Sequence, residues 1–243
     1  MQDLGIIGFG NFGKLLTRAL KPFFNIWVYD SAEIQQQASE IGVRASNLET
    51  VASKEIVILA VPVRVFESVL LQIKDKLHPR ALVLDVSSVK VKPVELMKKH
   101  LPQNVELIGT HPLFGPESTK NGFVGLNITL CDIRSKRLPC LKDFLNKHFQ
   151  LNIFEKTPQQ HDKEMAYVQV LTHFVAKALQ QIDIPTPSQS TRAYENLFQM
   201  KEYLRYDSEA LFMTLQQENP FGAEIRKEFF EKLIEIDGTI KDV

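Results

Sequence analysis

Short apolar runs alternate with amphipathic segments along the first two thirds of this chain. There are seven such runs: Leu4 to Phe9, Ile26 to Tyr29, Ile56 to Val61, Ala81 to Val86, Val105 to Gly109, Asn127 to Cys131 and Leu151 to Phe154. Several are continuously apolar, as strands buried on both faces are. The alternation predicts βαβ units, and therefore an α/β fold with a doubly wound, mainly parallel sheet over residues 1–156.

The strand signals stop after Glu155, and a different pattern begins. Thr157 and Gln160 form a Thr-x-x-Gln capping box with Pro158 at the first helical position, which predicts a long helix over 157–182. Further helices are expected over 190–203, over 208–217 and after Asn219-Pro220. We therefore expect a second, small all-helical domain over residues 157–243.

The first of these helices is apolar around most of its circumference. Its apolar residues are Met165, Val168, Leu171, Phe174, Val175, Ala178, Leu179 and Ile182. A small all-helical unit buries such a helix most easily against another copy of itself. The sequence predicts a homodimer built through the C-terminal helices.

Composition excludes several classes of partner. Lys plus Arg and Asp plus Glu both number 29, so no field of one sign is present to bind nucleic acid or an anionic membrane. No apolar run approaches the ~20 residues of a membrane span. Cys131 and Cys140 lack the spacing of a metal site or a disulfide framework, which favours a cytoplasmic protein without a structural metal.

A glycine-rich loop, Gly8-Phe9-Gly10-Asn11-Phe12-Gly13, directly follows the first expected strand and opens a helix. This is the dinucleotide-binding fingerprint of a Rossmann-type sheet. The first glycine permits the tight turn, the second lets the backbone approach a pyrophosphate, and the third lets helix and strand pack closely. A glycine turn that only packs is the alternative.

The acidic residue at the end of the second expected strand, Asp30, indicates the type of cofactor. A carboxylate there accepts hydrogen bonds from ribose hydroxyls and repels a 2′-phosphate, and Ser31 to Glu33 supply no cation. NAD is therefore favoured over NADP, with Asn11, Phe12 and Val61 also expected at the cofactor. A helix N-cap is a compatible second role for Asp30.

Two polar segments each follow an expected central strand. One is Asp85-Val86-Ser87-Ser88-Val89-Lys90 and the other is Thr110-His111-Pro112. Ligands of open α/β sheets bind at the carboxyl ends of the strands, so both segments should face the nicotinamide. A neutral imidazole there can accept a proton while a hydride leaves a carbinol carbon, which makes His111 a candidate base. The alternatives are a structural histidine and, for Ser88, a helix N-cap.

The chain resembles the prephenate and arogenate dehydrogenases of tyrosine biosynthesis. The resemblance covers nearly the whole chain and is present in GFGNFG with Asp30, DVSSVK at 85–90, GTHPLFGPE at 109–117 and HDKEMAYVQVLTHF at 161–174. It implies that His111 accepts the proton of the substrate's ring hydroxyl and that Ser88 hydrogen-bonds in the same place. It also implies that the chain catalyses an NAD-dependent oxidative decarboxylation. For Lys90 two roles stay open: it attracts substrate carboxylates, or it is a solvated residue of the first helical turn.

Polar residues interrupt the otherwise apolar first helix of the second domain. At about 100° per residue, Asp162, Gln169 and His173 fall close to one line, and a polar line on a buried helix needs partners. In the family this segment lines the substrate cleft, so Gln169 and His173 are expected to contact the substrate, with His161 nearby. A stripe that faces water is the alternative.

One position departs from the prephenate-using pattern. The segment AYENLFQMKEYLRYDSEALF at 193–212 is more similar to the arogenate-using branch. Tyr203 stands where the prephenate branch has an arginine that pairs with a substrate carboxylate, and a hydroxyl replaces a guanidinium weakly. Two other hypotheses stay open: a 3-hydroxyacid dehydrogenase or imine reductase of similar architecture, and a paralogue that binds NAD without activity.

Overall fold

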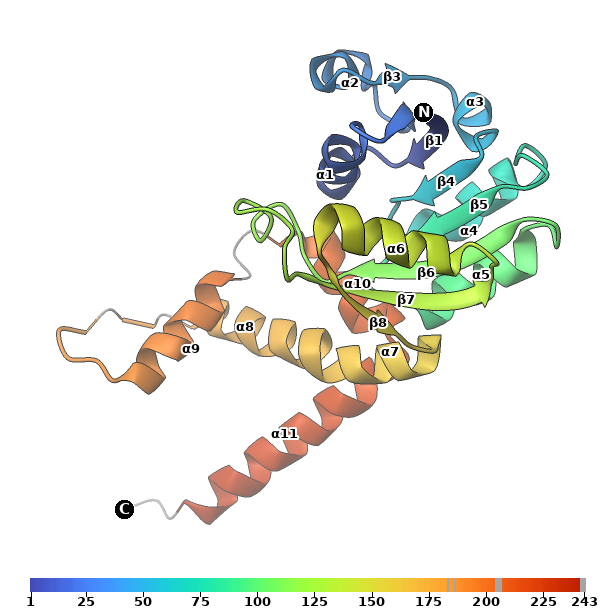
Figure 1. Ribbon diagram of the computed structural model, residues 1–243. Helices are drawn as coiled ribbons and strands as arrows, with labels where there is room; N and C mark the ends of the chain where they lie inside the picture. The colour runs from blue at the N-terminus through green and yellow to red at the C-terminus, as the bar shows by residue number, and fades with distance from the viewer. Residues whose placement is uncertain (183, 186, 204–206, 241–243) are drawn as a thin grey trace. The chain divides into compact units, whose positions relative to one another are not determined.

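An eight-stranded sheet forms the centre of the N-terminal part of the chain (Figure 1). The computed structural model describes residues 1–182, 184–185, 187–203 and 207–240. The strands are β1 (Gln2–Ile7), β2 (Phe24–Tyr29), β3 (Arg44–Ala45), β4 (Ile56–Leu59), β5 (Leu82–Asp85), β6 (Glu106–Pro112), β7 (Asn127–Arg134) and β8 (Asn152–Glu155). Their order is β3-β2-β1-β4-β5-β6-β7-β8. The predicted doubly wound, mainly parallel sheet is confirmed.

Six helices connect the strands. They are α1 (Asn11–Leu20), α2 (Gln35–Ile41), α3 (Leu48–Ala52), α4 (Val63–Ile73), α5 (Val91–His100) and α6 (Leu138–Phe149). Successive strand residues such as Ile6 and Ile7 belong to different apolar clusters, because side chains alternate across a sheet. Helices α1, α2 and α6 pack on one face, and α3, α4 and α5 pack on the other.

One pair of neighbouring strands differs from the rest. β7 runs antiparallel to β6, whereas the other strand pairs are parallel. His111 lies opposite Thr129 in this antiparallel ladder. The pairing extends β6 beyond Gly109, where the apolar run ends, through His111 to Pro112. The candidate base is therefore held by strand hydrogen bonding and not by a loop.

The chain divides into two compact units, Met1–His161 and Asp162–Val243. The structure places this boundary within the helix α7 (Pro158–Met165), five residues after the boundary that the sequence predicts between residues 156 and 157. The helices there are α7 (Pro158–Met165), η1 (Ala166–Leu171), α8 (Thr172–Gln181), α9 (Arg192–Tyr203), α10 (Glu209–Glu218) and α11 (Gly222–Thr239). Ala166, Val170, Leu215 and Ile225 form the buried core of the second unit.

The helix expected over 157–182 begins as predicted. Thr157 N donates to Gln160 Oε1 (3.0 Å) and Gln160 N donates to Thr157 Oγ1 (3.2 Å), which is the capping box. The helix is not a continuous α-helix, however, because the six residues of η1 form a π-helix. In the described part of the chain, no helix combines the length and the hydrophobicity that crossing a bilayer requires.

Candidate active site

The glycine-rich loop lies between β1 and α1 and has the geometry that its fingerprint predicts. Gly8 has a φ of 104°, and a Cβ atom there would lie 2.3 Å from the carbonyl oxygen of Ala60. A Cβ atom at Gly13 would lie 2.1 Å from the carbonyl oxygen of Gly8. At Gly10, by contrast, a Cβ atom would meet no described atom within 4 Å. The backbone at Gly10 is therefore open to a ligand.

The start of α1 offers an anion-binding site. Gly10 is its N-cap and has no side chain to cap the helix, and Asn11 and Phe12 are its first two residues. No acidic residue lies in the first turn, so the free N–H groups and the helix dipole favour a phosphate. Val61 borders this loop, because its Cγ1 atom would lie 3.1 Å from a Cβ atom at Gly8. These residues fit a dinucleotide.

The carboxylate of Asp30 closes the other side of the loop. Its Oδ2 atom accepts a hydrogen bond from Phe9 N (2.7 Å), and its Oδ1 atom accepts one from Ala32 N (3.0 Å). A carboxylate has about four acceptor positions, so hydrogen bonds from ribose hydroxyls remain possible. Asp30 does not cap a helix, because α2 begins at Gln35 with Ile34 as its N-cap. Asp30 thus orders the glycine-rich loop.

The ends of β5 and β6 are joined by a buried ion pair. The Lys90 ammonium contacts the Asp85 carboxylate, and both side chains are fully buried. Lys90 also donates to the Thr110 carbonyl oxygen (2.5 Å), while Thr110 Oγ1 donates to the Asp85 carbonyl oxygen (2.6 Å). The prediction that Lys90 is solvated or binds substrate carboxylates is therefore wrong: its charge is engaged inside the protein, where it holds two strand ends together.

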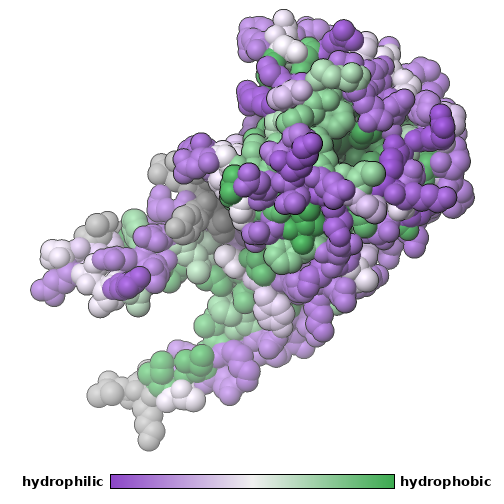
Figure 2. Space-filling model, viewed as in Figure 1, coloured by the Kyte–Doolittle hydropathy of each residue, from purple (hydrophilic) through white to green (hydrophobic). Residues whose placement is uncertain are grey.

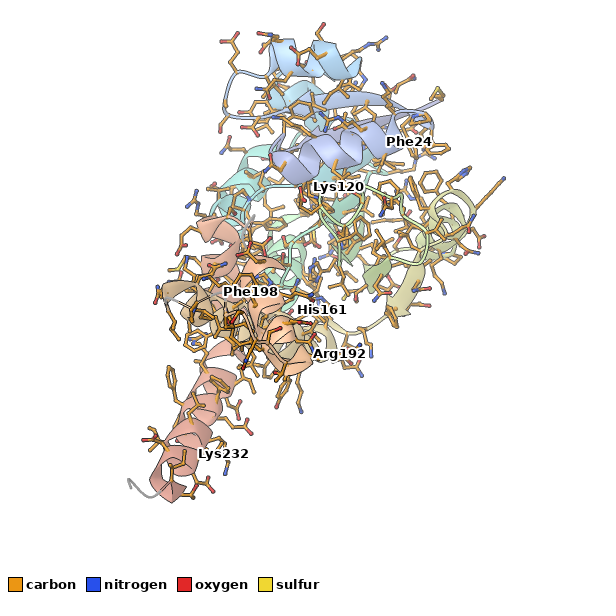
Figure 3. The ribbon with its side chains drawn as sticks, turned by 90° about the vertical axis from the view of Figure 1, so that its left-hand side faces the viewer. Phe24, Lys120, His161, Arg192, Phe198 and Lys232 are labelled. Atoms are coloured by element: carbon orange, nitrogen blue, oxygen red, sulfur yellow. The ribbon has the colours of Figure 1, made fainter. Side chains whose placement is uncertain are left out.

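The candidate base, His111, is buried and touches a second histidine. Its Nδ1 atom lies 2.8 Å from Nε2 of His161, and the two side chains are 3% and 1% exposed. Burial, followed by the charges of His161 and Lys90, holds the pKa of His111 well below its usual value. His111 is therefore neutral at pH 7, as a base must be. His161 lies on α7 (Figure 3), where it contacts His111; a contact of His161 with the substrate stays a prediction.

Two serines occupy the loop between β5 and α5. Ser88 is half-buried, and its hydroxyl makes no hydrogen bond to another described residue. It is not a helix N-cap, because Lys90 holds that position of α5. The hydroxyl of Ser87 is buried and also lacks a partner among the described residues, although Ser87 N donates to Asp85 Oδ2 (3.0 Å). The half-buried Ser88 hydroxyl is therefore available to a ligand at the carboxyl edge of the sheet, whereas the Ser87 hydroxyl is buried.

In the second unit, Gln169 lies within the π-helix. Its Oε1 atom is buried and has no hydrogen-bond partner among the described residues. A π turn holds more residues than an α turn, so the predicted line of Asp162, Gln169 and His173 does not follow one α-helical face. Gln216 Nε2 donates to the Val170 carbonyl oxygen of the widened turn (2.9 Å). Single π turns inside helices are frequent at functional sites.

His173 is paired with an acidic residue that sequence reasoning did not single out. Its Nδ1 atom lies 3.6 Å from Oδ2 of Asp207. Burial lowers the pKa of His173, and the Asp207 charge opposes that shift; burial likewise raises the pKa of Asp207 against the effect of His173. Tyr203 is the last residue of α9, but its side chain lies outside the described part of the chain, as does all of Arg205.

Fold and site together define a class of protein. A Rossmann-type sheet, a glycine loop open at the start of α1 and a neutral, buried histidine at the carboxyl edge of the sheet are the parts of a nucleotide-dependent dehydrogenase. The acidic residue at the end of β2 belongs to the same pattern.

The chain belongs to the prephenate dehydrogenase family. A family model described as the nucleotide-binding domain of prephenate dehydrogenase matches residues 14–149. Chloroplastic arogenate dehydrogenase 1 of Arabidopsis thaliana is 31% identical over 245 residues, and arogenate dehydrogenase 2 of the same plant is 29% identical over 254 residues. Each match covers 95% of this chain, but this chain spans only 38% and 70% of the two relatives.

A crystal structure of prephenate dehydrogenase from Aquifex aeolicus, in complex with hydroxyphenyl propionate and NAD+, has the same fold. Its TM-score is 0.77 at 23% identity, and the match covers 97% of this chain and 88% of that chain. This likeness confirms the architecture expected from the apolar runs and the glycine loop.

Proposed function

We propose that this chain catalyses an NAD-dependent oxidative decarboxylation, either of prephenate to 4-hydroxyphenylpyruvate or of L-arogenate to L-tyrosine. The observation that supports it best is the neutral, buried His111 at the carboxyl end of β6. A base that must take a hydroxyl proton needs its lone pair free at working pH. The substrate class, prephenate or arogenate, is supported by the names of the similar proteins, which are arogenate and prephenate dehydrogenases.

The chain's own residues have separate roles in this reaction. His111 accepts the proton of the ring hydroxyl, and the Ser88 hydroxyl, which has no partner among the described residues, hydrogen-bonds to the same oxygen. The nicotinamide, when bound, accepts the hydride. Loss of the ring carboxylate as CO2 then aromatises the ring and makes the reaction effectively irreversible. Gln169 and His173 stay predictions as substrate contacts.

NAD is the cofactor that the loop favours. The Asp30 carboxylate at the end of β2 is half-buried and its next residues include no cation, so a 2′-phosphate would meet uncompensated negative charge. NADP binding is expected to be weaker for this reason.

Between the two substrates, L-arogenate is favoured. The two plant relatives carry the name arogenate dehydrogenase, and Tyr203 stands where the prephenate-using pattern has an arginine. A guanidinium forms two parallel hydrogen bonds with a carboxylate, and a tyrosine hydroxyl forms at most one. Arogenate has the same two carboxylates as prephenate, but it carries a protonated amino group in place of the keto group, which places a positive charge beside one carboxylate within the substrate itself.

The experiment that tests this function follows absorbance of the reduced cofactor with prephenate and arogenate in turn, each with NAD and NADP. The proposal expects turnover with NAD and at least one of the two acids. The variant His111→Asn should lose about 10²–10⁴-fold in turnover and keep its NAD affinity. NAD binding without turnover of either acid would instead indicate an inactive paralogue, and wild-type turnover in His111→Asn would remove His111 from the mechanism.

We also infer that the second unit forms a homodimer. Phe230, Leu233, Ile234, Ile236 and Ile240, all on or just after α11, are 45–71% exposed. Figure 2 shows hydrophobic surface along this helix. The unit's buried core is small, and large apolar side chains on a small unit favour burial against a second copy. A cytoplasmic location stays a prediction, supported by two cysteines that form no disulfide in the described part of the chain.

A further inference from the structure

Two buried imidazoles lie in direct contact at the end of β6. Nδ1 of His111 and Nε2 of His161 are 2.8 Å apart, and the ring planes are inclined by 71°. One ring comes from β6 and the other from α7, where Figure 3 labels His161. Both side chains are more than nine-tenths buried. Bulk water therefore has little access to a proton that arrives on either ring.

A hydrogen bond between two neutral imidazoles contains one proton, which either ring can supply. If His111 is the base, Nε2 must hold a free lone pair, since Nδ1 already faces His161. The proton of the neutral ring then resides on Nδ1, and His111 donates to Nε2 of His161. The base role therefore selects one of the two arrangements.

A proton added to His111 creates a positive charge in an unfavourable place. Burial is the main cause that holds the pKa of His111 low, and the positive charge of Lys90 at the start of α5 also opposes a further positive charge there; a charge on His161 would oppose it in the same way. Asp85 compensates Lys90, but it does so through a direct ion pair that is already formed. His111 is thus a good first acceptor and a poor place for the proton to stay.

We propose that His161 receives this proton from His111, so that the two histidines act as a relay. The O–H bond of the substrate hydroxyl breaks and its proton binds Nε2 of His111. The Nδ1–H bond of His111 breaks, and that proton binds Nε2 of His161. His111 ends neutral and His161 ends as an imidazolium, so one proton has moved through the pair. The relay rests on the proposed dehydrogenase function. His161 acts only through His111, from which it receives the proton.

The first test measures proton transfer during turnover. His161→Phe fills the site but cannot accept a proton, so kcat should fall by roughly 10- to 100-fold, less than when the base itself is lost, with an unchanged KM. A plot of kcat against the deuterium fraction of the solvent should be curved in the wild type, because two protons move, and linear in His161→Phe. His148→Phe, a change at an exposed histidine, should keep the curved plot. A curved plot in His161→Phe would overturn the relay.

The second test needs neither a substrate nor a variant. Nitrogen-15 and proton NMR of the histidine rings in the wild-type protein reports which nitrogen of each ring is protonated. The relay expects His111 to be protonated at Nδ1 and unprotonated at Nε2, with Nε2 of His161 unprotonated. A proton on Nε2 of His111 would overturn it. If neither acid is turned over, the dehydrogenase proposal fails, while this measurement still decides the arrangement of the pair.

Discussion

Lys90 and Asp85 form an ion pair in which both side chains are fully buried. The pair lies between β5, which precedes the Ser88 loop, and β6, which carries His111. Because the Lys90 ammonium also binds the Thr110 carbonyl oxygen, the residue next to the base is held by the same charge. The ion pair therefore links the geometry of both candidate catalytic segments, and the Lys90 charge adds to burial in keeping His111 neutral.

Replacing Lys90 by Met should destabilise the protein by about 3–5 kcal/mol, because it leaves the Asp85 carboxylate buried without its cation. Urea unfolding followed by circular dichroism measures this change. Lys98→Met is the matched control, since Lys98 lies on the exposed side of the same helix and should change stability by less than about 0.5 kcal/mol. Equal effects of the two substitutions would contradict a structural role for the ion pair.

The stability of the protein should fall in mild acid because of His111. Its pKa is well below the usual value in the folded state, so below about pH 6.5 the unfolded chain binds a proton that the folded chain does not. The free energy of unfolding therefore decreases as the pH falls from about 6.5 toward the folded pKa. His111→Asn removes this contribution, and its stability should depend less on pH over that range. Parallel profiles from urea unfolding at several pH values would refute the prediction.

Most of the fold could be predicted from the sequence because its main strands are continuous apolar runs. The run ending at Val61, for example, contains β4. The two-residue β3 was missed because so short a strand leaves no pattern. The antiparallel β7 could not be recognised, since the direction of a strand leaves no periodic signal. The π-helix was missed because the spacing of the polar residues on this helix was interpreted with a constant α-helical angle.

The candidate site was predicted less completely, for reasons of burial and distance. His111 and the glycine loop belong to local motifs, so their positions in the sequence were sufficient. Lys90 was misinterpreted because a lysine after a strand is usually solvated, and only the fold brings the Thr110 carbonyl oxygen to it. The contact between His111 and His161 joins residues 50 positions apart, which no local pattern can indicate.

Two glycine substitutions should separate folding from cofactor binding. Gly13→Ala places a Cβ atom 2.1 Å from the Gly8 carbonyl oxygen, so α1 must move away from β1 and Tm should fall. Gly10→Ala meets no described atom within 4 Å, so Tm should be unchanged while the new methyl group obstructs the approach of a pyrophosphate. Thermal unfolding and calorimetric titration with NAD measure both effects. Unchanged NAD affinity in Gly10→Ala would show that the cofactor does not approach this part of the loop.

The exposed apolar side chains of α11 should hold two copies of the chain together. Ile234 is 71% exposed, and replacing it by Glu places a charge in the proposed interface. Light scattering after size exclusion should give twice 27.8 kDa for the wild type and a shift toward the single-chain mass for Ile234→Glu. Glu228→Lys alters an exposed charged position of the same helix and should leave the mass unchanged. Since a buried carboxylate without a partner costs several kcal/mol, even a stable dimer should weaken measurably. A wild type of single-chain mass at high concentration would exclude the dimer.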